Sequence, residues 1–443
     1  MNRRAMLSKR RMIGFVLVSL CFALWGIANE MNILIKPTLG SIFMMNELDA
    51  QVIEYSFCGS YFLMALPAAI YTWSTSFKSG ITLGLVLYAF GAFLFYPAAQ
   101  SGEYMLFCIA NFVLAAGLSF LETSANPYIL TLGSEKHALF RLNLAQSFNS
   151  LGWLMGFYLA INVVQKNIFG LSPLQRLHLD PIQFRQVRDA DLQLVSSPYL
   201  WIGVAVVILA VIIGVAKIPE EHEMKPMYYY DEESDVVEDR SFWGAMSRLV
   251  SNRRYNLGFI AQFFYVGCQI LCWSYIVDYS KTVLTANGYT EQMANATSGN
   301  MMLLGFVLFA LFRIISTFVI RVVQPSILLG IMATLGVVLT VVAYVLFNVT
   351  GMYILVGMGA CMSLMFPTIY GIALSELDLD MVKVGAAGQI MAIFGGTAIP
   401  LAVHFFFGNS VFGGCSMAVC MAVILAFSIW VIREEKKWKQ IEN

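Results

Sequence analysis

The sequence predicts an all-α integral membrane protein with twelve spanning helices in two sets of six. Hydrophobic residues make up 59% of the 443-residue chain and charged residues only 12%, whereas a soluble domain carries about 25% charged residues. The surface that charges would otherwise cover must therefore face a lipid bilayer. The formal net charge is +0, so charge gives no reason to expect nucleic acid as a partner.

Apolar stretches long enough to cross a bilayer recur along the whole chain. A helix needs about 20 mostly apolar residues to span the hydrocarbon core. By this criterion the predicted spans are 12–38, 50–72, 80–99, 104–131, 139–164, 198–217, 255–279, 291–320, 327–347, 353–374, 382–407 and 413–432.

A polar segment divides these spans into two groups of six. It runs from Pro219 to Arg248 and contains the acidic run at 231–233. The predicted domains are an N-terminal bundle (1–218), a cytoplasmic central loop (219–250) and a C-terminal bundle (251–443). Such doubling is typical of transporters built from repeats.

Lys and Arg gather in both tails and in alternate connections, which predicts that both termini are cytoplasmic. We expect the basic start to be retained and the protein to lie in a bacterial inner membrane. The outer loop at 165–197 also carries basic residues, but long loops weigh less in this rule. Its mixture of apolar and polar residues predicts one or two short surface helices.

The fourth and fifth spans carry polar side chains in otherwise apolar sequence. Glu122 and Asn126 lie one turn apart on one helical face, and Gln146, Asn149 and Ser150 share another. A carboxylate with amides suits a sugar, because each hydroxyl needs both an acceptor and a donor. Hydrogen bonding between neighbouring helices is the competing interpretation, especially for the amides. We interpret Glu122 as functional, because a charge within a span is costly.

The first spans of the two halves carry similar polar stripes. The first has Glu30 beside a stripe of Trp25, Asn29, Asn32 and Lys36, and the seventh has Gln262, Tyr265, Gln269 and Trp273. Aromatic faces can stack on a sugar ring while amides bind its hydroxyls. An inter-helix seam is the alternative, but the presence of stripes in both halves favours a cavity lining.

Internal echoes favour a parallel repeat. Gln146 precedes Gly152 at the same interval as Gln389 precedes Gly395, and Pro127 is echoed by Pro367. Trp25 is also followed by Glu30 at the same interval as Trp273 is by Asp278.

Three further features complete the prediction. Lys36 and Glu54 could form a structural salt bridge at the outer mouth, and Arg313 fits a gate or a bundle contact. The 8 cysteines and 4 histidines have no spacing that would hold a metal. We therefore expect no metal or cofactor, and no enzyme activity.

The chain resembles the fucose–proton symporter family of the major facilitator superfamily. The resemblance rests on Leu24-Trp25, on 121–123 with 125–127, on 141–146 with 148–150, and on 261–263, 265–267, 272–275 and 367–369. It implies a major facilitator fold of two six-helix bundles, alternating access and a central sugar site.

The same resemblance implies roles for individual residues. Glu122 would couple sugar binding to protonation, Gln146 and Asn149 would contact sugar, and Asn29 and Asn32 match family asparagines. The family's expected proton-carrying Asp is Ile33 here, whereas Glu30 stands where the family has Asn. The acid could have moved by one helical turn.

The resulting hypothesis is import of a monosaccharide, L-fucose or a related hexose, by proton symport through Glu122 and Glu30. The predicted sugar contacts are Trp25, Asn29, Asn32, Glu122, Asn126, Gln146, Asn149, Gln262, Tyr265, Gln269 and Trp273. Sodium coupling or uncoupled transport of glucose or galactose is the alternative, and a sugar sensor without transport is a remote one. We expect a monomer.

Overall fold

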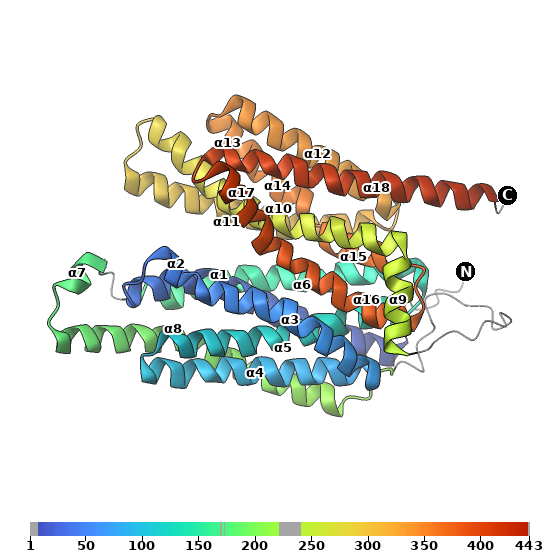
Figure 1. The fold of residues 1–443 in the computed structure, drawn as a ribbon, viewed down its shortest axis with the longest axis horizontal. Helices are drawn as coiled ribbons and strands as arrows, with labels where there is room; N and C mark the ends of the chain where they lie inside the picture. Colours follow the sequence, from blue (N-terminus) through green and yellow to red (C-terminus); the bar gives the residue numbers. More distant parts are fainter. Residues whose placement is uncertain (1–7, 169–170, 172, 221–240, 442–443) are drawn as a thin grey trace. The chain divides into compact units, whose positions relative to one another are not determined.

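The computed structural model describes residues 8–168, 171, 173–220 and 241–441 (Figure 1). Within these ranges the chain is helical and contains no strand. Twelve of the described helical segments are long and apolar enough to cross a membrane, which confirms the predicted fold class. The acidic run at 231–233, and most of the predicted central loop, lie outside the described residues.

The first half of the chain contains the following elements: α1 (Lys9–Ile42), α2 (Glu47–Ala50), α3 (Val52–Ser74), α4 (Phe77–Ser101), α5 (Tyr104–Thr131), η1 (Glu135–His137), α6 (Ala138–Leu159), the π-helical η2 (Ala160–Gln165), α7 (Pro173–Leu177) and α8 (Pro181–Val215).

The second half begins with the short α9 (Phe242–Ser251). Its other elements are α10 (Arg253–Ala286), α11 (Glu291–Val319), α12 (Pro325–Leu346), α13 (Val349–Val356), α14 (Met358–Met362), α15 (Met365–Leu374), α16 (Leu379–Met391), η4 (Ala392–Phe394), α17 (Gly395–Phe407), η5 (Val411–Cys415) and α18 (Ser416–Ile441).

The contacts within the chain define two compact units. The first comprises Met1–Gly133 with Phe148–Lys225, and the second comprises Ser134–Ser147 with Pro226–Asn443. In the first unit α4 lies beside α5 and α8, and α3 packs on α5. In the second, α12 and α18 lie side by side, and α10 packs against α11, α15, α17 and α18.

The sixth spanning helix differs from its prediction, because α8 begins at Pro181 rather than near Pro198. Asp180 caps it by accepting hydrogen bonds from the backbone N–H groups of Ile182 and Gln183 (2.9 and 2.8 Å), and a proline suits the first helical position. The polar residues predicted as a surface segment therefore form the first turns of α8, and α7 is a separate short helix.

A buried ion pair ties α7 to this extension. Arg176 Nη2 donates to Asp191 Oδ2 at 2.5 Å, and the two side chains are 1% and 0% exposed. A hydropathy criterion counts both residues as polar loop, although they are paired inside the fold. Removal of one partner of such a pair typically costs about 3–5 kcal/mol.

Each unit contains a close helix contact at the glycine that follows its Gln in the internal echo. A Cβ placed on Gly152 of α6 would lie 2.1 Å from the carbonyl oxygen of Ala23 in α1. A Cβ on Gly395 would likewise lie 2.1 Å from the carbonyl oxygen of Phe263 in α10. Only glycine permits this approach of the two backbones, so each half uses its Gln–Gly motif to seat the fifth span of that half against the first.

We predict that Gly152→Ala destabilises the protein. The added methyl must displace backbone, at a cost of about 1–3 kcal/mol, although alanine alone favours helix by about 1 kcal/mol. Gly214→Ala in α8 is the control, because its Cβ would meet nothing within 4 Å. Thermal unfolding in detergent should show a lower Tm for Gly152→Ala and an equal or higher Tm for Gly214→Ala. Equal Tm values for both variants would contradict the close-contact interpretation.

Candidate functional site

Glu122 lies deep inside the first unit, near the middle of α5. Its side chain is 1% exposed, and its Oε1 accepts a hydrogen bond of 2.7 Å from the hydroxyl of Tyr61 in α3. The other oxygen, Oε2, has no hydrogen-bond partner among the described residues. Asn126, predicted to share this face, donates to the Glu122 backbone carbonyl at 3.0 Å. The carboxyl group therefore has one donor and one oxygen available to a proton or ligand.

Tyr61 was not predicted from the sequence, yet it joins two residues that were. Its hydroxyl bonds Glu122 and also interacts with the side chain of Trp25 from α1. The ring is 2% exposed. The sequence signal was weak, because tyrosines are common in spans and do not stand out as a carboxylate does.

Glu30 lies apart from this cluster. It is 0% exposed, and within the described part of the chain neither carboxyl oxygen has a hydrogen-bond partner. Its Cβ lies against Gly156 of α6, where a Cβ on that glycine would be 2.9 Å away. An ionised carboxylate without donors is very costly in such a place, so this geometry suits a neutral carboxyl group.

The predicted amides of the first unit make contacts within the protein. Asn32 accepts a hydrogen bond from Asn111 of α5 (2.8 Å), and Asn149 donates to the carbonyl of Phe22 in α1 (3.3 Å). Both are buried, whereas Asn29 is half-buried. Asn111 was not predicted. The inter-helix interpretation therefore describes part of what Asn32 and Asn149 do.

The predicted stripe of the second unit is more heterogeneous. Tyr265 donates to the carbonyl of Met362 (3.2 Å), and Trp273 packs edge-on against Phe306 with ring centroids 4.6 Å apart. Gln269 is 8% exposed. Gln262 is 0% exposed, and neither atom of its amide finds a hydrogen-bond partner in the described structure. The Gln262 amide thus differs from the Tyr265 hydroxyl, which is bonded within the protein.

Arg313 of α11 is buried at a break in the tenth span. It donates to the carbonyl of Ser363 (2.5 Å), which ends α14, and to the carbonyl of Gln146 in α6 (3.2 Å). The guanidinium also lies over the Phe309 ring at 4.5 Å. The predicted bundle contact is thus observed, and it engages the backbone of Gln146.

Near the C-terminal end of α1, the predicted salt bridge is confirmed. Lys36 Nζ lies 3.1 Å from Glu54 Oε2 and also donates to Gln51, which in turn donates to Glu54 at 2.8 Å. The two charged side chains are 33% and 35% exposed. Partly exposed pairs stabilise little, about 0–1 kcal/mol.

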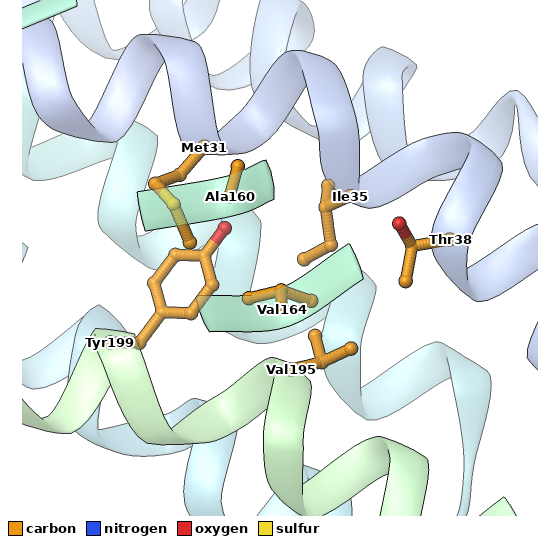
Figure 2. A pocket seen from close by; sticks show the side chains of 7 residues that line it. All are labelled: Met31, Ile35, Thr38, Ala160, Val164, Val195 and Tyr199. Atoms are coloured by element: carbon orange, nitrogen blue, oxygen red, sulfur yellow. The ribbon is translucent and has the colours of Figure 1, made fainter. Parts of the chain in front are cut away.

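Figure 2 shows a small pocket between α1, η2 and α8 of the first unit. It has a volume of about 10 Å³, which suits roughly one water molecule, and it is therefore too small for a sugar. Its lining residues are Met31, Ile35, Thr38, Ala160, Val164, Val195 and Tyr199. None of these residues belongs to the predicted site, so this pocket does not locate it.

Comparisons with known proteins agree with this architecture. Residues 15–402 match the model described as the Major Facilitator Superfamily, a class of membrane transporters. The chain is 37% identical over 399 residues to the L-fucose-proton symporter of Haemophilus influenzae, with 89% of each chain covered. It is 30% identical over 400 residues to the glucose/galactose transporter of Brucella abortus, with 89% of this chain and 88% of that one covered.

A crystal structure of the Escherichia coli fucose:proton symporter is also similar. It matches with a TM-score of 0.83 and 31% sequence identity, over 96% of this chain and 99% of that chain. The chain therefore belongs to the fucose–proton symporter family of the Major Facilitator Superfamily. It is accordingly an integral membrane transporter with twelve described spans, and not an enzyme.

We predict that Gln262→Leu leaves the fold as stable as before, or more stable by about 1–3 kcal/mol, because the replaced amide has an unfavourable burial cost. Asn111→Leu is the matched control, since that amide donates to Asn32 and to the carbonyl of Ile53 (2.8 and 3.0 Å). Thermal unfolding should separate the two variants, with a lower Tm for Asn111→Leu only. A similar loss for Gln262→Leu would indicate that its amide is held by the protein.

Proposed function

We propose that the protein imports a monosaccharide, L-fucose or a closely related hexose, by proton symport with alternating access. The observation that carries this proposal is the buried Glu122 carboxyl of α5, which has a hydroxyl donor on one oxygen and no described partner on the other. The names of the relatives supply the substrate and the ion, since two of them are L-fucose-proton symporters.

The proposed mechanism follows from the cost of burying charge. A neutral carboxyl group can pass through an occluded state far more cheaply than a carboxylate. Glu122 would take a proton from the outside, remain neutral while sugar and protein reorient, and release the proton inside. Glu30 is proposed as a second carrier, because it is buried and has no described donor.

The proposed sugar contacts divide by chemistry. Aromatic side chains would stack on the apolar face of the ring, and amides would bind its hydroxyl groups. The proposed sugar contacts are Trp25, Asn29, Asn32, Asn126, Gln146, Asn149, Gln262, Tyr265, Gln269 and Trp273, together with Glu122. Gln262 is the strongest amide candidate, because sugar binding would satisfy an otherwise unpaired group.

A glucose or galactose transporter is the second candidate, favoured by the Brucella abortus relative. Sodium coupling would then use the oxygens of Glu30, Asn29 and Asn32. We also propose the bacterial inner membrane as the location, with both termini cytoplasmic and a monomer as the working unit. The proposed organisation is two six-helix bundles at 1–218 and 251–443, with a central loop at 219–250.

Uptake into proteoliposomes tests the proposal. The purified full-length protein would be given labelled L-fucose, D-galactose or D-glucose under an imposed proton gradient and, separately, a sodium gradient. We expect L-fucose to accumulate under the proton gradient and not under the sodium gradient. Sodium-driven accumulation of glucose or galactose would instead support the second candidate, and no transport of any of the three would refute both.

We predict that Glu122→Gln abolishes uphill uptake but retains sugar exchange, because glutamine resembles the protonated acid and cannot release a proton. The accumulation ratio of labelled sugar should fall to unity, while counterflow between equal sugar concentrations continues. Glu30→Gln, measured in parallel, tests the second carrier by the same two assays. Normal uphill uptake by Glu122→Gln would exclude this residue as the coupling acid.

A further inference from the structure

We infer that Tyr61 couples sugar binding to protonation of Glu122, as a positioning residue that interacts with the predicted sugar contact Trp25 and hydrogen-bonds the acid. The inference rests on the proposed function. It adds a residue that the sequence did not indicate and a physical route between the two ligands.

The first step is the bond between the phenol and the acid. The Tyr61 hydroxyl donates to Glu122 Oε1 at 2.7 Å, and both side chains are buried. A hydroxyl donor binds a carboxylate more strongly than a neutral carboxyl group. Tyr61 therefore favours proton release from Glu122, and loss of this bond favours proton retention.

The second step is the interaction of Tyr61 with Trp25, one of the predicted sugar contacts. The Trp25 side chain of α1 interacts with Tyr61, and Trp25 also packs against Phe22 with ring centroids 5.8 Å apart. A sugar stacked on Trp25 would alter the surroundings of the Tyr61 hydroxyl, and hence the donor that Glu122 receives. Sugar affinity and proton affinity must then depend on each other by the same factor.

The third step is that the backbones of Tyr61 and Glu122 are held together. Ser119 of α5, one turn before Glu122, donates to the carbonyl of Tyr61 (3.2 Å). Ser60 of α3 donates to the carbonyl of Phe112 in α5 (2.7 Å). Beyond the pair, the hydroxyls of Thr72 in α3 and Ser124 in α5 lie 3.0 Å apart. The two helices are thus tied on both sides of the pair, so the orientation of the Tyr61 hydroxyl is the part that is free to respond.

The surroundings of the pair contain few other titratable groups. Among the described residues, Cys58 of α3 and Glu122 are titratable neighbours of Tyr61, and Tyr61 is a titratable neighbour of Glu122. From α4, the hydroxyl of Tyr88 donates to the carbonyl of Leu24 (2.9 Å). Glu30 of α1 has no hydrogen bond to either residue in the described structure.

The test compares Tyr61→Phe with Tyr88→Phe in the full-length protein in proteoliposomes. Each variant loses one buried hydroxyl, but only Tyr61 bonds a carboxyl group. The measurements are L-fucose exchange and its KM across a range of pH. For Tyr61→Phe we expect the alkaline limb of exchange, and the pH at which KM begins to rise, to move together to higher pH. The expected shift is about one pH unit, a tenfold change in proton concentration. Tyr88→Phe should keep the wild-type profile.

A second variant distinguishes the proposed effect from a folding defect. A fluorinated tyrosine at position 61 keeps the ring and makes the hydroxyl a stronger donor, so both profiles should move to lower pH. In the Glu122→Gln background, Tyr61→Phe should change neither profile, because the acid it acts on is gone.

Three results would overturn the inference: a wild-type profile for both position-61 variants, a shift that persists with Glu122→Gln, or an exchange shift without a KM shift. Absence of any proton-dependent L-fucose uptake by the wild-type protein would instead refute the proposed function itself.

Discussion

The structure depends on one constraint: a chain in an apolar environment must satisfy its polar groups internally. The hydrocarbon core offers no water for hydrogen bonds, and lipid is as apolar as leucine, so packing and internal hydrogen bonds hold the helices together. In the first unit Asn111 joins Asn32, and Thr72 pairs with Ser124 (3.0 Å). Among the described residues, Glu30, Gln262 and Gln389 are buried with both polar side-chain atoms unpaired. An unpaired buried group is retained most readily where a ligand or a proton satisfies it during transport.

Close contacts at glycines are the second feature that holds the helices together. Gly152 and Gly395 bring two helix backbones into contact in each half, and their partners Ala23 and Phe263 are separated by the same number of residues as Pro127 and Pro367. A shift of 240 residues therefore relates both of these pairs, whereas Gly152 and Gly395 themselves are 243 residues apart. The shift of 240 residues places Trp25 opposite Tyr265.

Hydropathy predicted the number of spans, because bilayer thickness imposes a length that sequence alone reveals. Hydropathy did not predict the start of α8. It scores Asp191 of α8 and Arg176 of α7 as polar and takes no account of the ion pair between them. Glu122 was identifiable because a carboxylate in a span is rare. Tyr61 was not identifiable, because its role depends on the packing of α3 against α5. The periodicity of the sequence does not reveal that packing. The same limit applies to Asn111 and to the backbone contacts of Arg313.

The 240-residue shift between the halves also shows where the two units differ at a tyrosine hydroxyl. It places Glu122 opposite Met362, just as it places Trp25 opposite Tyr265. In the second unit Tyr265 bonds the Met362 backbone carbonyl directly (3.2 Å), and a carbonyl cannot change its charge. In the first unit the hydroxyl of Tyr61 donates to the titratable side chain of Glu122, and Tyr61 also interacts with Trp25. A similar arrangement of helices thus yields a fixed structural bond in one half and a contact that can respond to protonation in the other.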